Sequence, residues 1–202
     1  MEKRRSEKRE LILSAAQELF FQNGYSDTRI IDIAEKAGIG KGTVYEYFTG
    51  KGELFYQLFY ERIAKPSETI KEIKTLEGPS SDKIRAYVVH TFRMMDDIPF
   101  AKLTPDMLDK MDCMKDERLQ KLFRDTVNGH IELIQDVIEK GIQTGEFRKI
   151  DTYLAAIFFL AICHMGYKVE IDLLNNFENA SKMDKEKLID EIMDFSLAAL
   201  RT

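Results

Sequence analysis

A short segment in the first quarter of the chain concentrates side chains that can bind phosphate. Lys41, Thr43, Tyr45 and Tyr47 lie within seven residues of one another, and Lys51 follows closely. Phosphates are held by Lys and Arg, by hydroxyl groups and by the exposed N–H groups that begin a helix. Thr and Tyr can also contact base edges and methyl groups. These residue types at this spacing favour a surface that contacts a nucleic-acid backbone.

Glycines next to this segment indicate how it is positioned. Six of the 11 glycines fall within residues 24–52. Gly38 is predicted to close a helix in a left-handed conformation, which only glycine adopts cheaply. The next helix is predicted over 41–48, with Val44 and Phe48 four residues apart and facing the core. The side chains that then project away from the core are those of Thr43, Tyr45, Glu46 and Tyr47.

Three further helices are predicted to frame this segment. Apolar residues at i, i+3, i+4 and i+7 predict a helix over 6–22, ended by Asn23-Gly24, and another from about 30 to 37. Thr28 is the expected N-cap of the second. A helix from Lys51 to Lys65 is predicted to follow the phosphate-binding segment. Two short helices joined by a glycine-containing turn form a helix-turn-helix unit.

The segment TRIIDIAEKAGIGKGTVYEYFTGKGELF closely resembles the DNA-binding signature of the tetracycline-repressor (TetR) family. The similarity covers about residues 8 to 59, roughly a quarter of the chain. It implies a transcriptional repressor that binds a palindromic double-stranded DNA operator as a homodimer and is released by a small-molecule effector. The DNA contacts that the resemblance implies are Thr28, Arg29, Lys41, Gly42, Thr43, Tyr45, Tyr47 and Lys51.

The rest of the chain is also predicted to be helical, so the expected fold is all-α. Apolar periodicity predicts further helices over 80–97, about 106–114, 116–144, 151–174 and 184–200. We expect residues 1–52 to form the helix-turn-helix DNA-binding domain. Residues 53–202 are expected to form a larger helical domain for effector binding and dimerisation.

Two apolar segments could form the dimer interface. The runs LAAIFFLAIC and LIDEIMDFSLAAL combine small and bulky apolar residues, as interfaces between helices do. Helix-turn-helix proteins read paired half-sites as two-fold dimers. The alternative is that both segments build only the core of one subunit.

A methionine-rich region suggests where a ligand binds. Five of the 9 methionines lie within residues 94–114. Methionine is flexible and polarizable, which suits a pocket for apolar or amphipathic ligands. Plain core filling is the alternative. The candidate pocket residues are Phe92, Met95, Met107, Met111, Phe123, His130 and Phe158.

Charge is distributed unevenly along the chain. Residues 1–51 hold 9 basic and 8 acidic side chains, a net of +1, and residues 52–202 hold 21 and 27, a net of −6. The total of −5 argues against a protein that coats nucleic acid indiscriminately. Five basic residues form an N-terminal arm suited to a localised phosphate contact: Lys3, Arg4, Arg5, Lys8 and Arg9.

The sequence shows no motif that is typical of other classes of function. The three histidines have no second ligand at i+3 or i+4, so we predict no metal site, and no motif implies a cofactor. The absence of a nucleophile elbow, a phosphate-cradling loop and paired carboxylates argues against an enzyme. The longest apolar run, 153–163, is too short to span a membrane, and two cysteines suit a cytoplasmic protein. A ligand-responsive activator, a helical enzyme and a structural protein are the alternatives.

Overall fold

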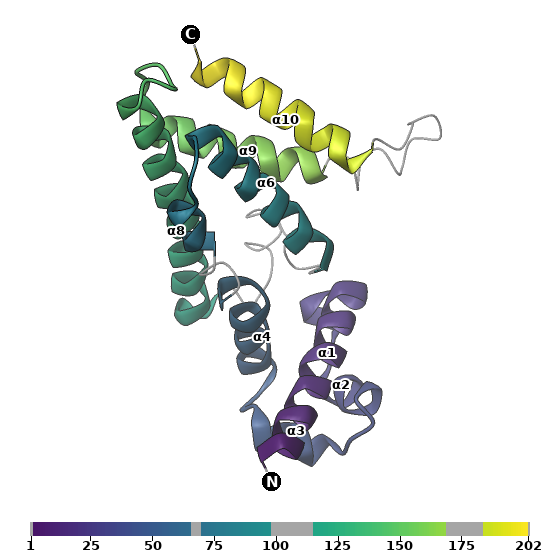
Figure 1. Ribbon diagram of the computed structural model, residues 1–202. Coiled ribbons are helices and arrows are strands. Elements are labelled where there is room, and N and C mark those ends of the chain that lie inside the picture. The colour runs from purple at the N-terminus through teal and green to yellow at the C-terminus, as the bar shows by residue number, and fades with distance from the viewer. Residues whose placement is uncertain (1, 66–69, 98–114, 169–183, 202) are drawn as a thin grey trace. The chain divides into compact units, whose positions relative to one another are not determined.

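The computed structural model of the chain describes residues 2–65, 70–97, 115–168 and 184–201 (Figure 1). These ranges are helical and hold no strand, which confirms the predicted all-α fold. The predicted helix over 106–114 and the end of the one over 151–174 lie outside the described residues. The elements are α1 (Glu2–Asp27), α2 (Ile30–Lys36), α3 (Lys41–Tyr47), α4 (Lys51–Phe59), the π-helical turn η1 (Tyr60–Ala64), the 3-10 helix η2 (Ile70–Thr75), α6 (Ser80–Asp97), α8 (Glu117–Gln143), α9 (Thr152–Lys168) and α10 (Lys185–Leu200).

The chain divides into two compact units. Unit 1 comprises residues 1–66 and 98–124, and unit 2 comprises residues 67–97 and 125–202. Helix α8 is continuous across this division, with its first turns in unit 1 and the remainder in unit 2. Unit 1 includes α4 together with the helices before it, and the predicted domain boundary after residue 52 stays a prediction.

Unit 1 has a small core made by its first four helices (Figure 1). Its fully buried side chains come from every one of these helices and include Ile12, Leu13, Ala16, Ile33, Ala34, Val44, Leu54, Phe55 and Leu58. Phe20 of α1 meets Phe55 of α4 edge to face, with ring centroids 5.4 Å apart. Aromatic contacts of this geometry add to the gain from burying the rings. The core thereby holds the short α2 and α3, which are too short to be stable alone.

Two glycines end the helices of unit 1 as predicted. Gly24 has φ 81° and breaks α1, and Gly38 has φ 68° directly after the end of α2. Both lie in the left-handed region that favours glycine. The Ile39 N–H then donates to the Ala34 carbonyl at 3.0 Å, which closes the turn into α3. Helix α1 begins at Glu2, four residues before the predicted start, so the basic arm is helical.

The prediction that Thr28 caps α2 is wrong. Arg29 is the N-cap, and its backbone N–H donates to the Asp32 carboxylate at 3.1 Å. The Thr28 hydroxyl turns back toward α1 and donates to the carbonyls of Leu19 at 3.1 Å and Gly24 at 2.7 Å. Because Asp32 supplies the cap from inside α2, Thr28 is available to satisfy carbonyls at the broken end of α1.

The helix predicted over 51–65 changes geometry after Phe59. In the π-helical turn η1, the Lys65 N–H donates to the Tyr60 carbonyl five residues earlier. A π-turn adds a residue to one helical turn, so the side chains after it point in a different direction around the helix axis. Ile63 and Ala64 are both buried beyond this shift.

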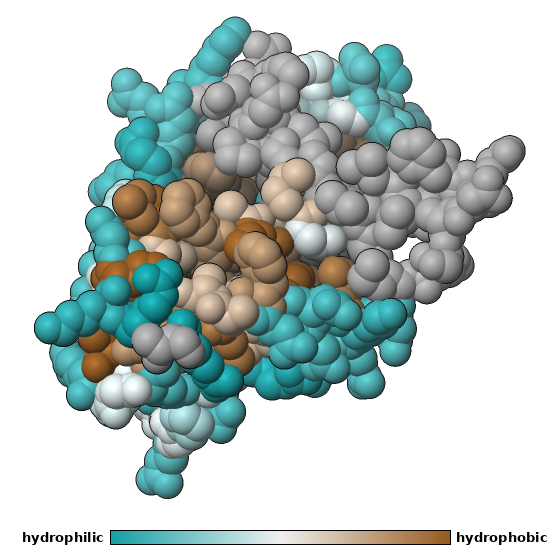
Figure 2. All heavy atoms as spheres, turned by 90° about the horizontal axis from the view of Figure 1, so that it is seen from above, coloured by the Kyte–Doolittle hydropathy of each residue, from teal (hydrophilic) through white to brown (hydrophobic). Residues whose placement is uncertain are grey.

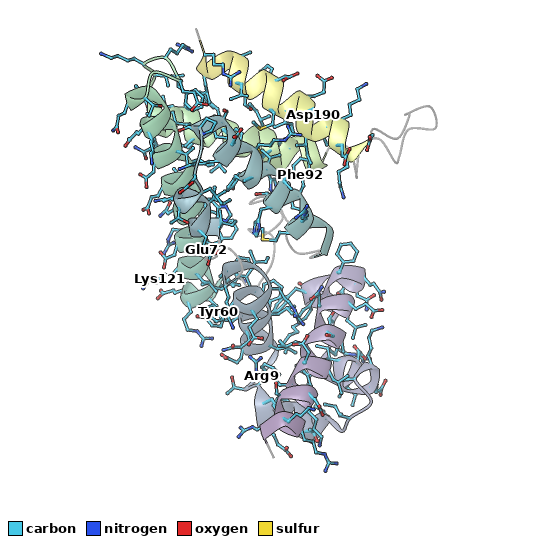
Figure 3. All side chains as sticks on the ribbon, in the orientation of Figure 1. Arg9, Tyr60, Glu72, Phe92, Lys121 and Asp190 are labelled. Atoms are coloured by element: carbon cyan, nitrogen blue, oxygen red, sulfur yellow. The ribbon has the colours of Figure 1, made fainter. Side chains whose placement is uncertain are left out.

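Unit 2 is formed by η2, α6, the longer part of α8, α9 and α10. Helix α10 packs against both α6 and α9 (Figure 1). The core of unit 2 consists mainly of aliphatic and aromatic side chains. Its most buried members include Ile84, Val88, Phe92, Leu133, Ile134, Ile138, Ala156, Phe159 and Cys163. On the surface, Arg85 of α6 pairs with Asp190 of α10 at 2.6 Å, and Asp190 is labelled in Figure 3.

The end of α8 forms a tight corner in unit 2. Phe147 lies against Gly141, where an added Cβ would be 2.2 Å from the ring, so only glycine fits. Next to it, the Glu146 carboxylate accepts the backbone N–H groups of Ser80 at 2.6 Å and Ser81 at 2.9 Å. A residue distant in sequence thus satisfies donors at the start of α6.

Large apolar side chains on α8, α9 and α10 are exposed to solvent. Val127 of α8 is 38% exposed, Phe158 of α9 is 62% exposed and Phe195 of α10 is 65% exposed. Helix α9 is apolar nearly all round, so periodicity could not show which of its faces packs inside the unit.

Candidate nucleic-acid interface

Helix α3 presents most of its side chains outward. Val44 is fully buried and Phe48 is 2% exposed, and together they anchor the helix to unit 1. Tyr45 is 49% exposed, and Lys41 is exposed beside it, with its ammonium 6.0 Å from the Tyr45 ring centroid. Thr43 and Tyr47 are half-buried, whereas Gly42 and Glu46 are exposed. This helix therefore offers a cation, hydroxyl groups and an aromatic ring on one exposed surface.

The N-terminal basic segment lies beside α3. The Arg5 guanidinium of α1 lies 5.9 Å from the centroid of the Tyr47 ring. Arg9, labelled in Figure 3, lies 5.5 Å from the Phe48 ring and forms a 2.5 Å ion pair with Glu61. Lys3, Arg4 and Arg5 are exposed. Sequence analysis identified these cations, but it could not show which of them lie against the aromatic rings of α3.

Lys51 has a structural role that sequence analysis missed. Its ammonium donates to the carbonyls of Tyr25 at 2.8 Å and Ser26 at 3.0 Å, and it lies 4.4 Å from the Tyr25 ring centroid. An ammonium has three N–H donors, so these bonds leave one for another partner. Lys51 thus ties the start of α4 to the end of α1, and its contact with DNA stays a prediction.

The resemblance also implies DNA contacts from Thr28 and Arg29, and the side chains of these two residues differ in exposure. Thr28 is 1% exposed and its hydroxyl is committed to α1, so its side chain is withdrawn from the predicted contacts. The Arg29 side chain is 75% exposed and forms an ion pair with Asp32 at 2.7 Å. Hydrogen bonds from Arg29 hold the pKa of Asp32 below its usual value, so this pair stays ionised near neutral pH.

The candidate ligand residues come from both compact units, and their common pocket stays a prediction. Phe92 and Met95 are buried on α6 in unit 2. Phe123 belongs to unit 1, where its ring centroid lies 6.1 Å from that of Phe59. Phe158 is 62% exposed on α9, and its place in a pocket stays a prediction. Met107 and Met111 lie outside the described residues.

His130 takes part in a buried polar contact. Its Nδ1 lies 2.7 Å from the hydroxyl of Tyr87, a side chain that is 2% exposed on α6. Burial lowers the pKa of His130 to about 4, and nearby His90 adds to this effect. Sequence analysis did not select Tyr87 or His90, although their i, i+3 spacing on one helix was a signal for a shared polar face.

The described residues were also compared with three other kinds of feature: a reactive cysteine, a metal site and a membrane-spanning helix. Burial raises the pKa of the Cys163 thiol to about 12, which makes it unreactive at neutral pH, and Cys113 lies outside these ranges. The described residues hold no group of three His, Cys, Asp or Glu arranged to bind a metal ion. None of the helices described has the length and apolar character needed to cross a membrane.

The family model for the bacterial regulatory proteins of the tetR family matches residues 12–58, which run from α1 to α4. The chain is a TetR-family transcriptional regulator. TetR-family regulators bind DNA, and the helix-turn-helix unit of this one comprises α2 and α3. The enzyme and structural alternatives are thereby set aside.

Relatives of this TetR-family regulator extend over most of its length. The fatty acid metabolism regulator protein of Bacillus subtilis is 26% identical over 146 residues, covering 71% of this chain and 73% of its own. The transcriptional regulator YhgD of Bacillus subtilis is 26% identical over 185 residues, covering 90% and 91%. The FadR regulator of Bacillus subtilis, solved in complex with stearoyl-CoA, has a TM-score of 0.73 at 19% identity, covering 95% and 98%. The last comparison shows a shared fold.

Proposed function

We propose that this TetR-family regulator represses transcription from a palindromic operator, which it binds as a homodimer, and that a fatty-acyl ligand releases it. The observation that carries the proposal is α3, whose Val44 and Phe48 anchor it while Lys41 and Tyr45 stay exposed. A short anchored helix with an exposed polar face is what a major groove admits. The regulator acts in the cytoplasm, where the operator is accessible.

The proposed DNA contacts divide into two kinds. Lys41, Arg29 and Arg5 supply charge for phosphates, and the remaining donor of Lys51 can add to them. Thr43, Tyr45 and Tyr47 supply hydroxyl groups and rings for base edges, thymine methyl groups and sugars, while Gly42 permits close approach of the backbone. Phosphate contacts fix the position of the protein, whereas contacts with base edges select the sequence.

An exposed apolar surface supports the homodimer. Leu154, Phe158 and Met165 of α9 are 47%, 62% and 49% exposed, and Phe195 of α10 is 65% exposed. The three α9 residues follow helical spacing along one stripe, and α10 packs beside α9. Figure 2 shows apolar side chains gathered on one face of the protein and bordered by hydrophilic ones. Large exposed apolar patches mark interaction sites, and a second copy of the chain is the occupant we propose.

The relatives support the effector class. One is named a fatty acid metabolism regulator, and a structure of similar fold was solved with stearoyl-CoA. Phe92 and Met95 supply apolar surface within unit 2, which suits an acyl chain. A ligand can release DNA only if it binds the released state more tightly, typically by about 1–3 kcal/mol of coupling.

The proposal is tested by selecting bound DNA from a random pool with the full-length protein. We expect an inverted repeat, with an affinity that falls steeply as salt rises. Adding stearoyl-CoA to the complex with the selected DNA should weaken binding, whereas coenzyme A alone should not. Transcription in vitro from a promoter carrying the selected site separates repression from activation. Selection of DNA without a repeat, or complexes indifferent to every acyl compound, would contradict the proposal.

A further inference from the structure

Three polar side chains gather inside unit 2 and have no role in the DNA interface. Tyr87 and His90 lie one turn apart on α6, and His130 of α8 meets Tyr87 with 2.7 Å between Nδ1 and the hydroxyl oxygen. The rings of Tyr87 and His130 are edge to face, with centroids 5.7 Å apart. We refer to Tyr87, His90 and His130 as the polar cluster.

The surroundings of the polar cluster are apolar. The Phe159 ring centroid lies 5.9 Å from that of Tyr87, and Cys163 is close enough to affect the Tyr87 phenol. Phe92, labelled on α6 in Figure 3, is 1% exposed. Polar groups in such surroundings are costly unless each of them is hydrogen-bonded.

One atom of the cluster stays unsatisfied. The Nε2 atom of His90 is buried and has no hydrogen-bond partner among the residues that the structure describes. Leaving a buried donor or acceptor unpaired is strongly unfavourable, so such an atom calls for a partner. A bound ligand can supply that partner, and an ordered water molecule is the competing explanation.

The cluster is uncharged near neutral pH. Burial lowers the pKa of His130 to about 4. Burial also lowers the pKa of His90, with a further contribution from Arg93, which is itself exposed to solvent. Burial raises the pKa of Tyr87. A carboxylate brought here would lose its hydration, and the buried ammonium of Lys83 on the same helix already donates to the Lys74 carbonyl at 3.1 Å. An uncharged carbonyl would need only a donor.

We infer that the polar cluster is the polar end of the effector site and that it binds the uncharged carbonyl oxygen of a fatty-acyl thioester. His90 donates from Nε2 to that oxygen, while Tyr87 and His130 hold each other in place beside it. The inference rests on the proposed fatty-acyl effector and adds to it which chemical form is recognised. The free acid, which carries a carboxylate at neutral pH, is the form that the cluster disfavours.

The test compares two probes that differ only at the carbonyl. Stearoyl-CoA carries the thioester, and S-octadecyl-CoA has the same chain length with a thioether and no carbonyl oxygen. Both are titrated into the full-length protein by calorimetry, together with stearate and coenzyme A. We expect the wild-type protein to prefer the thioester over the thioether by about tenfold, the value of one hydrogen bond to a buried donor. Stearate should bind more weakly than the thioester.

Variants test whether the polar cluster causes the preference for the thioester over the thioether. His90→Phe should reduce it to less than about twofold while leaving the affinity for the thioether unchanged. Tyr87→Phe, which keeps the ring and removes the hydroxyl, should reduce it partly and provides the test if His90→Phe fails to fold. Arg85→Gln, an exposed change on the same helix, is the matched control and should keep the full preference.

The outcomes separate two kinds of failure. Equal binding of thioester and thioether by wild type, with DNA release by both, would overturn the polar cluster as a carbonyl site and leave the proposed function intact. An unchanged preference in His90→Phe, or tighter binding of stearate, would overturn it in the same way. If neither acyl-CoA compound bound, the proposed effector class would be wrong and this inference would fall with it.

Discussion

Arg118, in the first turn of α8, donates a hydrogen bond from Nη1 to Oε2 of Glu53, in the first turn of α4, at 3.1 Å. The same guanidinium donates to Asp116 at 2.8 Å and lies 5.1 Å from the Tyr56 ring centroid. These contacts lie within unit 1, and Glu53 and Tyr56 follow shortly after α3, the proposed DNA-reading helix, in the sequence. Because α8 continues from Arg118 to His130, one helix carries both this contact and a residue of the polar cluster.

We predict that Arg118→Ala weakens the effect of the ligand on DNA binding. The Arg118 side chain is 59% exposed, so solvent screens its pair with Glu53 and the loss of the pair should leave the melting temperature within about 2 °C of wild type. DNA affinity without ligand should stay within about threefold, while the shift caused by stearoyl-CoA should shrink. Fluorescence anisotropy on operator DNA with and without ligand measures both quantities. Arg85→Ala, which removes an exposed ion pair within unit 2, is the control, and an equal loss of response in it would refute the role of Arg118.

Thr28 offers a test of the corrected assignment. Thr28→Val keeps the shape of the side chain and removes the hydroxyl that donates to Leu19 and Gly24. Urea denaturation should show a loss of about 1–2 kcal/mol in the free energy of unfolding, because two part-buried hydrogen bonds to backbone carbonyls are removed. The folded variant should bind operator DNA as tightly as wild type. Weaker DNA binding at unchanged stability would return Thr28 to the DNA contacts.

The proposed dimer is tested at Phe158, which is 62% exposed on α9. Phe158→Glu would place a carboxylate in the interface of both copies, so the dissociation constant measured by sedimentation should rise by at least about 100-fold. Val127→Glu changes another exposed apolar residue of unit 2, on α8, and should leave the dimer intact. A Phe158→Glu protein that sediments as wild type does would exclude this stripe of α9 from the interface.

Glu146 links the stability of unit 2 to pH. Burial raises the pKa of its carboxyl group, but hydrogen bonds from Ser81 and Ser80 outweigh burial and leave the pKa below the ordinary value of 4.5. A lowered folded-state pKa contributes stability above the unfolded-state pKa, and that contribution is lost as pH falls through the folded-state pKa. We expect Glu146→Gln to lower the free energy of unfolding at pH 7, with a smaller difference from wild type at about pH 3.5. A difference that is the same at both pH values would show that the carboxylate charge is not responsible.

Local signals in the sequence were enough to predict most of the helices. The span of α6 (Ser80–Asp97) agrees with the prediction, because apolar periodicity and the preceding Pro79 are both local. The left-handed turn at Gly38 was predictable for the same reason. These features depend on neighbouring residues, which periodicity and turn chemistry describe well.

Features that depend on distant contacts were not predictable. The bonds from Lys51 to the carbonyls of Tyr25 and Ser26 join residues about 25 apart in the chain, and no local pattern marks them. Phe123 was grouped with Phe92 by residue type, yet the two belong to different compact units. Only the packed chain determines which apolar side chains share a core.

The central claim is that the exposed face of α3 reads DNA twice in each dimer. Hydroxyl-radical footprinting of the selected operator, with wild type and with Tyr45→Ala, tests it most directly. We predict two protected half-sites related by a dyad, with centres about one helical turn apart or a multiple of that distance. In Tyr45→Ala, which should remain folded because Tyr45 is 49% exposed, both footprints should weaken together. A single protected site, or a Tyr45→Ala footprint equal to that of wild type, would contradict the claim.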